Sequence, residues 1–228
     1  MADGFSTLLL SQRIDAAVGA RAMLSHSLYR AWSAGTLPLD TLKLYARQYF
    51  HHVEAFPRAV SATHAACPDA HGRRMLAENL AEEEGLGEGR APHAELWMNF
   101  AESLGETREA VLGETRNAET QALIDTFRRL SRQSYAAGLG ALYAYETQLP
   151  DVSTTKIDGL TRFYGVTDAA GLGFFRVHEL ADVEHSAVCR DLLDRLPDAD
   201  REEALSAAAE LSDALLGFLS GVERASIH

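Results

Sequence analysis

Three polar side chains in the segment from Phe174 to Leu193 have a spacing that suits metal binding. His178, Asp182 and His185 occur at positions i, i+4 and i+7. On a helix that advances about 100° per residue, all three leave the axis within about 60° of one another. Two imidazoles and one carboxylate on a single stripe form half of a site for iron, manganese or zinc. The alternative is a solvated polar face, since Glu179 and Glu184 add further charge to this helix.

Glu146 is a carboxylate in a segment that has no polar face. It follows Tyr143, Ala144 and Tyr145 in an almost entirely apolar stretch. Burial of an isolated carboxylate is costly, so Glu146 requires a counter-charge. A metal cation would supply it. The alternatives are Lys156, the next basic residue along the chain, or a histidine from another helix.

Three consecutive acids, Glu82, Glu83 and Glu84, lie at the expected end of a helix. Negative charge is unfavourable at a helix C-terminus, so one of them should be recruited by something positive. The apolar positions up to Leu80 favour Glu83 or Glu84 as the inward-facing acid, and the alternative is a solvated charge run. His93 begins the next helix and, taken alone, would be an ordinary histidine. The same holds for the remaining candidates: His51, His52, His64 and His71.

Taken together, the candidates comprise three carboxylates and three imidazoles. They are Glu83, His93, Glu146, His178, Asp182 and His185. Two metal ions that share bridging carboxylates inside a helical bundle need about this many ligands. Nitrogen and oxygen ligands without thiolates suit iron or manganese and leave positions open for dioxygen.

The elements that would position these residues are all helical. Apolar residues recur at helical spacing, while period-2 alternation and hairpin turns are missing from the sequence. The expected helices cover Phe5–Ser33, Leu42–Val60, Asp69–Gly85, His93–Leu104, Thr120–Leu149, Val152–Tyr164, 168–196 and a last one from Asp198. This pattern predicts one all-α domain of seven or eight helices over residues 1–228.

Proline and glycine mark the expected boundaries. Pro57 predicts a kink or break within the second helix, and Pro150 predicts the end of the long helix before it. The segment Gly105–Gly113 reads as a linker. The second half of Thr120–Leu149 is apolar on all sides, which is typical of a central helix, and Gly138 and Gly140 would let its neighbours approach closely.

The composition of the chain argues against some classes of binding partner. The chain has 228 residues and a formal charge of −12, which argues against binding to nucleic acid or to an anionic membrane surface. No apolar stretch is expected to reach the length of a membrane span, and no signal peptide is evident. The two cysteines, Cys67 and Cys189, form no disulfide framework, so a reducing cytoplasmic location is expected.

Several segments resemble the haem-oxygenase-like di-metal oxidases, a group near the PQQ-synthesis protein C and TenA proteins. The segments are NLAEEEG…PHAELW, ALYAYETQLP…KIDGL and FFRVHELADVEH, and the similarity is greatest to the CADD-like branch (Chlamydia protein associating with death domains). The resemblance implies a seven-helix bundle with a di-iron or manganese–iron site. It assigns the metal ligands to the six candidates given above. This sequence departs from the family pattern in one place, because the segment between Glu83 and His93 is about three residues longer than the family pattern.

The same resemblance implies roles for residues outside the metal site. CADD-like proteins form para-aminobenzoate for folate synthesis from one of their own tyrosines and a lysine amino group, so each molecule acts once. Tyr29 matches the sacrificed tyrosine, Lys156 matches the amino donor, and Tyr45 and Tyr145 match further tyrosines near the site. A family tyrosine four residues before the first histidine of the stripe is replaced by Phe174. Without the resemblance, Tyr29 would read as a core residue and Lys156 as a surface or capping residue.

Three functional hypotheses follow. The first is a single-turnover di-metal oxygenase that uses dioxygen and an unidentified electron donor, and that forms a homodimer. The second is a di-iron oxidase of the same fold that acts on a bound amino acid, fatty acid or amine. The third is a metal-free binding or partner protein built on the same bundle. A PQQ-type cofactor oxidase, which does not need the full set of six ligands, is a weaker option besides these three.

Overall fold

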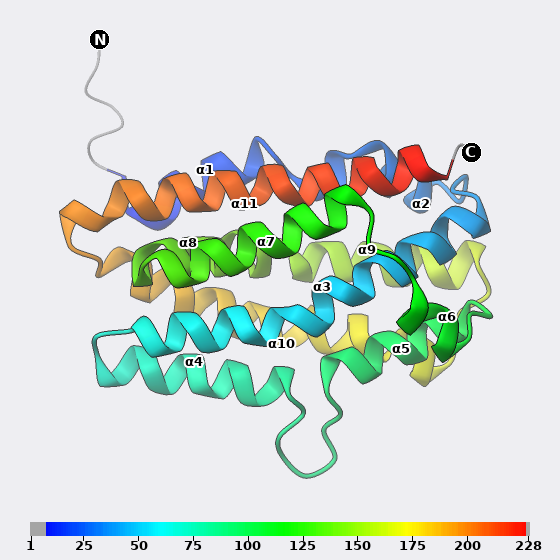
Figure 1. The fold of residues 1–228 in the computed structure, drawn as a ribbon, viewed down its shortest axis with the longest axis horizontal. Helices are drawn as coiled ribbons and strands as arrows, with labels where there is room; N and C mark the ends of the chain where they lie inside the picture. The colour runs from blue at the N-terminus through cyan, green and yellow to red at the C-terminus, as the bar shows by residue number, and fades with distance from the viewer. Residues whose placement is uncertain (1–7, 227–228) are drawn as a thin grey trace.

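The computed structural model describes residues 8–226, and these residues form α-helices with no strand among them (Figure 1). The prediction of an all-α fold is therefore confirmed. The helices are α1 Leu10–Gly19, α2 Ser27–Ser33, α3 Leu39–Ala66, α4 Ala70–Glu83, α5 His93–Ser103, α6 Arg108–Gly113, α7 Ala118–Gln133, α8 Tyr135–Glu146, α9 Leu149–Phe163, α10 Ala169–Asp194 and α11 Asp198–Ala225, with a 3₁₀ turn η1 Met23–Ser25. Phe5, the first residue of the first predicted helix, lies outside the described range.

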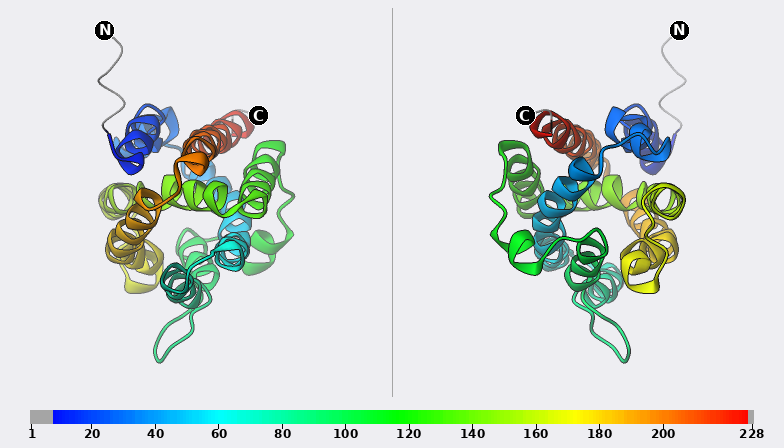
Figure 2. Two further views of the ribbon diagram at one scale, coloured as in Figure 1. Left: turned by 90° about the vertical axis from the view of Figure 1, so that its left-hand side faces the viewer. Right: turned by 90° about the vertical axis from the view of Figure 1, so that its right-hand side faces the viewer.

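The helix α8 is the central element of the bundle. It packs against α3, α7, α10 and α11, and every residue from Ala136 to Glu146 is buried. The end-on views in Figure 2 show α1 and α11 on one side of the bundle, and α4 with the loop that follows it on the opposite side. A helix that is apolar on all faces is expected at such a position. The prediction of a central helix is confirmed.

The predicted long helix Thr120–Leu149 is wrong in one respect, because it is broken at Ser134. Ser134 has extended backbone angles (φ −162°, ψ 168°), and its Oγ accepts a hydrogen bond from Ala137 N at 3.0 Å. Serine competes with helical hydrogen bonding and is favoured as an N-cap. The break starts α8 in a new direction and so sets where Glu146, its last residue, lies.

Other boundaries also differ from the predictions. The first predicted helix divides into α1, η1 and α2, because the His26 ring caps α2 by accepting from Leu28 N at 3.2 Å. The predicted linker 105–113 contains α6, whose first turn is capped by the Thr107 hydroxyl. Within the described residues, these breaks and the division at Ser134 give eleven α-helical segments, which is more than the seven or eight expected.

The break predicted at Pro57 and the helix end predicted at Pro150 both need correction, whereas the alternative of a kink at Pro57 stays a prediction. Pro57 does not split α3, which runs unbroken from Leu39 to Ala66 and packs along its length on α4, α5, α7 and α8. Tertiary packing of this kind outweighs the missing hydrogen bond of one proline. Pro150 lies in the first turn of α9 instead of ending the preceding helix. The missing N–H of proline costs nothing in a first turn.

The helix α11 corrects the expectation that no apolar stretch is long enough to span a membrane. By length and composition alone this helix could do so, and it is the one helix of this kind in the part of the chain that the structure describes. Half of its most apolar window is buried, and the helix packs against α8, α7 and α1. Its apolar character is accounted for by this packing.

Gly140 lets α8 and α11 approach closely, as the sequence predicted for this residue. A Cβ at Gly140 would lie 2.2 Å from the backbone oxygen of Ala204, and a backbone atom cannot swing away. We expect Gly140→Ala to lower the free energy of unfolding by about 3 kcal/mol. Gly217→Ala, on α11, places its Cβ where no atom lies within 4 Å and should stabilise the protein by roughly 0.5–1 kcal/mol. Urea denaturation measures both, and equal stability of the two variants would contradict the packing.

Candidate functional site

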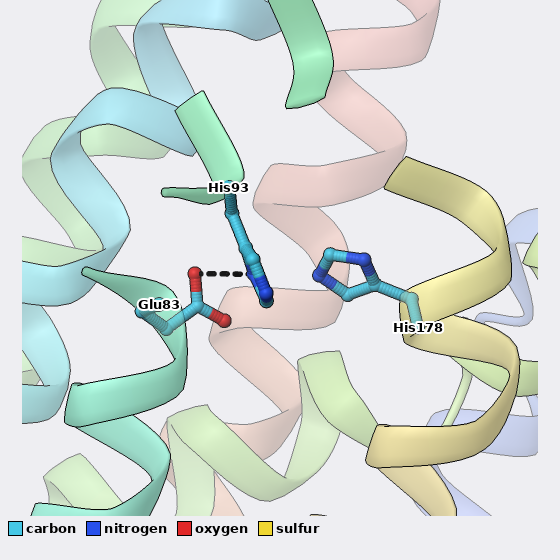
Figure 3. Close-up of side chains that lie close together, drawn as sticks. All are labelled: Glu83, His93 and His178. Atoms are coloured by element: carbon cyan, nitrogen blue, oxygen red, sulfur yellow. Dashed lines mark ion pairs between the residues drawn. The ribbon is translucent and has the colours of Figure 1, made fainter. Parts of the chain in front are cut away.

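The first half of the site brings together three side chains from three helices. Glu83 is the last residue of α4, His93 is the first residue of α5, and His178 lies in the middle of α10. Each offers one ligand atom, and these atoms all lie within 4.8 Å of one another. Figure 3 shows the Glu83 carboxylate and the two imidazole rings turned toward one shared space. All three side chains are buried.

The second half of the site lies beside the first along α10. Glu146, the last residue of α8, meets Asp182 and His185 of α10, again with one ligand atom from each within 4.8 Å. Glu146 and Asp182 are buried, and His185 is almost so. All six residues predicted as ligands therefore come together, in two groups of three.

Several buried polar atoms in these groups lack a hydrogen-bond partner among residues 8–226. They are Nδ1 of His93, Oδ2 of Asp182 and Nδ1 of His185. His93 Nδ1 lies only 2.8 Å from Glu83 Oε2, but the pair does not have the geometry of a hydrogen bond. Buried polar atoms without a partner are costly and rare. A cation between the carboxylates and the imidazoles would satisfy these atoms, so the donor set fits a metal.

Neighbouring groups orient the candidate ligands. His178 Nδ1 donates to the backbone oxygen of Phe174 at 2.7 Å, which leaves Nε2 as its ligand atom. Asn79 donates to Glu146 Oε1 at 2.6 Å, and the Cys189 thiol lies 3.4 Å from Glu146 Oε2. Supporting contacts of this kind are typical of metal sites, where they hold the ligands in the required rotamer. Asn79 and the role of Cys189 were not anticipated from the sequence.

The electrostatic state of these side chains also favours a cation. Burial raises the pKa of Glu83 to about 7 and raises the pKa values of Glu146 and Asp182 as well. Burial lowers the pKa of His93 to about 4. Burial alone would also lower the pKa of His185, but the adjacent Asp182 and Glu146 carboxylates raise it to about 9. A bound cation would stabilise the ionised carboxylates and the neutral imidazoles together.

The structure distinguishes the three consecutive acids. Glu83 is buried in the cluster and Glu84 is exposed. Glu82 is partly exposed, where its carboxylate binds Arg90 at 2.9 Å and lies 3.1 Å from His185 Nε2. Of the two acids that the apolar stripe favoured, Glu83 is therefore the one that faces the core.

The extended loop between α4 and α5 does not displace His93. Gly85, Gly87 and Gly89 all have positive φ angles, and the loop projects away from the bundle before it returns (Figure 1). At Gly85 the chain passes so close to Pro92 that a Cβ would lie 2.3 Å from its nitrogen. The additional residues are accommodated outside the bundle, and His93 still begins α5 next to Glu83.

A second cluster of predicted residues lies deep in the core. Lys156 of α9 donates from Nζ to the Tyr45 hydroxyl at 2.5 Å, and the hydroxyls of Tyr45 and Tyr29 are hydrogen bonded at 2.9 Å. Lys156 Nζ also lies 4.6 Å from the centroid of the Tyr29 ring. Burial holds the pKa of Lys156 well below its usual value, which favours the neutral amine. Lys156 contacts Tyr45 and is not the counter-charge for Glu146, which was one of the two alternatives to a metal; the other was a histidine from another helix, and His185 of α10 lies beside Glu146.

Tyr49 connects the two clusters and was not predicted as a site residue. Its hydroxyl is hydrogen bonded to that of Tyr145 at 2.8 Å, and its ring stacks on Tyr45 at 5.3 Å. Burial raises the pKa of Tyr49, and the carboxylates of Asp182 and Glu83 raise it further. The i, i+4 spacing of Tyr45 and Tyr49 on α3 was the signal that could have identified it.

Phe174, which stands where the family has a tyrosine, lies beside the candidate site. Its ring packs against His178 with 4.1 Å between centroids and also contacts Trp97. An aromatic ring is retained beside the site, without a hydroxyl.

The histidines expected to be ordinary do not join either ligand group among the described residues: His51, His52, His64 and His71.

Comparison with known proteins identifies the family. Residues 43–216 match the family described as iron-containing redox enzymes. The chain is 39% identical to a 4-aminobenzoate synthase of Chlamydia pneumoniae over 91% of this chain and 92% of the relative. It is 35% identical to a 4-aminobenzoate synthase of Nitrosomonas europaea over 95% and 92% of the two chains.

The fold agrees with that assignment. A protein from Shewanella denitrificans with a haem-oxygenase-like fold superposes with a TM-score of 0.80, at 16% identity, over 96% of this chain and 92% of that chain. The predicted resemblance and the predicted fold are therefore confirmed. The chain belongs to the iron-containing redox enzymes and has the haem-oxygenase-like fold.

Proposed function

We propose that the six clustered residues hold two metal ions, either two irons or one manganese and one iron. Glu83, His93 and His178 would bind one ion. Glu146, Asp182 and His185 would bind the other. The proposal is supported by the three orphaned buried atoms in these groups and by the iron-containing family to which the chain belongs. The absence of thiolate from the ligand set fits these hard or borderline metals.

We further propose that the enzyme forms 4-aminobenzoate from its own Tyr29 and Lys156. The observation that carries this is the buried contact between Lys156 Nζ and the Tyr29 ring at 4.6 Å. The similarity to 4-aminobenzoate synthases over nine-tenths of the chain supports the same product. The tyrosine would supply the aromatic ring, and the lysine would supply the nitrogen.

The protein side chains prepare this reaction in a dry pocket. With reduced metal and dioxygen, the centre would supply the oxidising equivalents. Lys156 is buried, and burial lowers the pKa of its amine, which favours the neutral form whose lone pair can act as a nucleophile. Tyr45 accepts a hydrogen bond from Lys156 and is bonded to Tyr29, and these two contacts hold the amine beside the ring. Burial raises the pKa of Tyr29, which keeps its hydroxyl protonated before reaction.

Isotope labelling tests this proposal directly, because the chain contains just two lysines, Lys43 and Lys156. Protein grown with [ε-¹⁵N]lysine is purified and incubated with Fe(II), a reductant and dioxygen, with no organic substrate. We expect ¹⁵N-labelled 4-aminobenzoate at no more than one molecule per chain, together with a mass change at positions 29 and 156. Unlabelled product, or repeated turnover without loss of these side chains, would contradict the proposal.

A second candidate function is oxidation of a bound small substrate at the same centre. A pocket of about 430 Å³ reaches the metal cluster at His93 and is lined by Glu82, Leu96, Val177 and Glu184. This space could admit an external molecule. The labelling experiment separates the two, because this candidate requires an added substrate and leaves Tyr29 and Lys156 unchanged.

The remaining expectations stay proposals. We propose a single domain over residues 1–228, a homodimeric state, a cytoplasmic location and an external electron donor that reduces the centre. The single-domain proposal is supported by one continuous core cluster that includes residues from Leu10 to Val222. We also propose that the chain binds neither nucleic acid nor membrane, which is supported by its net charge of −12.

A further inference from the structure

A second cavity, remote from the metal ligands, lies between α3 and α7. It has a volume of about 110 Å³, and Arg116, from the segment before α7, is among the residues that line it. Since a water molecule occupies roughly 10–15 Å³ by this measure, the cavity can hold on the order of ten atoms of that size. That corresponds to one small aromatic molecule.

The rim of this cavity is basic although the protein is strongly acidic. Four arginines line it, namely Arg58, Arg116, Arg128 and Arg132, against one acid, Glu54. The chain as a whole carries a formal charge of −12. A concentration of arginines in one cavity of such a chain marks a place where negative charge is attracted.

Arg132 is the arginine most available to a ligand, because Arg116 Nη1 already donates a hydrogen bond to Gln121 Oε1 at 3.3 Å. Arg58 pairs with Glu54 at 2.8 Å, and Arg128 pairs with Asp125. For Arg116 and Arg132, the described part of the chain provides no ion-pair partner. A guanidinium group binds a carboxylate through two parallel hydrogen bonds.

The inner wall of the cavity is aromatic. Phe56, Phe127 and the His52 ring line it, and His52 lies 5.7 Å from Phe127 and 6.0 Å from Phe56 between centroids. His52 is 1% exposed, and its Nε2 has no hydrogen-bond partner among residues 8–226. Burial lowers the pKa of His52 to about 3, so the ring is neutral and adds no charge to the inner wall.

We propose that this cavity binds a small aromatic carboxylate, with its ring against His52, Phe56 and Phe127 and its carboxylate toward Arg132, which follows Phe127 by five residues on α7. The arginines select the negative charge, and the aromatic wall selects a flat apolar body. The choice of 4-aminobenzoate as this ligand rests on the proposed function, whereas the ligand class rests on the cavity alone.

The wall of the cavity is shared with the interior where the proposed product would form. The Tyr145 ring lies 5.0 Å from His52 and 4.9 Å from Phe56, and Tyr145 is hydrogen bonded to Tyr49. The wall and a second aromatic layer, formed by Tyr145 and Tyr49, therefore separate this cavity from the cluster around Lys156. A carboxylate that leaves the core on this side meets the arginine-lined cavity next.

Binding of added 4-aminobenzoate tests the proposal without any synthesis by the enzyme. Isothermal titration calorimetry on the full chain, without metal or dioxygen, should show one site for 4-aminobenzoate and for benzoate. Aniline, which lacks the carboxylate, and inorganic phosphate, which lacks the ring, should each bind at least about tenfold more weakly. If aniline bound as tightly as 4-aminobenzoate, the cavity would not recognise a carboxylate. If inorganic phosphate bound as tightly, the cavity would not recognise an aromatic ring. Either result would overturn the proposal.

Variants locate the site. The double variant Arg116→Gln and Arg132→Gln should weaken 4-aminobenzoate binding by about tenfold or more. Arg74→Gln, an exposed arginine on α4, should leave binding unchanged. Unchanged affinity in the double variant, or no binding to the unaltered protein, would overturn the proposal. Because the ligand is added, such a failure is distinguishable from a failure to synthesise it.

Discussion

Replacement of Lys156 by methionine is expected to reduce 4-aminobenzoate formation by at least about 100-fold, because the nitrogen donor is removed. The amine is buried, which lowers its pKa, and methionine has a similar length and volume. The fold should therefore persist, with a change in unfolding free energy of less than about 1.5 kcal/mol. The variant should also take up as much iron as the unaltered protein, since Lys156 contacts Tyr45 and not the ligand groups. Product analysis by mass spectrometry, together with metal content, measures these outcomes.

Lys43 provides the matched control, because it is the other lysine of the chain. Its Nζ lies at the surface, 3.9 Å from Glu106. Lys43→Met should form as much product as the unaltered protein. If Lys156→Met retained product formation, the amino group would have to come from elsewhere and the proposed reaction would be wrong.

Asp182→Asn is expected to weaken metal binding by more than about 100-fold at one of the two positions, because it removes a charged ligand. The same change should stabilise the metal-free protein or leave its stability unchanged. Burial raises the pKa of Asp182, which means that the ionised carboxylate is unfavourable in the absence of a cation. Metal content and thermal unfolding without metal are measured on the same preparation.

This combination of effects separates a metal ligand from a structural residue. A purely structural carboxylate would lower stability when it is removed and would not change metal content. Asp191→Asn, on the same helix, is the control, because Asp191 is exposed and pairs with Arg195 at 2.8 Å. Loss of metal from the control variant, or full metal content in Asp182→Asn, would contradict the assignment.

The stripe on α10 could be predicted from the sequence because its residues belong to one helix. His178, Asp182 and His185 share a face by helical periodicity alone. Glu146 was identified by a different physical signal, a carboxylate in an apolar segment that must find a positive partner when buried. The choice of Glu83 over Glu84 required the observed end of α4, because the apolar stripe allowed both.

Features that depend on packing between helices were not predictable in this way. Ser134 breaks a segment whose apolar pattern is compatible with one helix, and the break depends on how α7 and α8 pack around it. Tyr49 reads as an ordinary apolar-face residue of α3, and only its position next to Tyr145 and Tyr45 shows its place between the clusters. The contact of Lys156 with the Tyr29 ring joins helices that are far apart in the sequence.

Anomalous X-ray diffraction from crystals of the iron-loaded, reduced protein tests the central claim most directly. The account predicts two iron peaks. One should be bounded by Glu83, His93 and His178, and the other should be bounded by Glu146, Asp182 and His185. A well-ordered crystal with no iron at these side chains, or with iron bound elsewhere in the chain, would contradict the proposed dinuclear centre and the chemistry built on it.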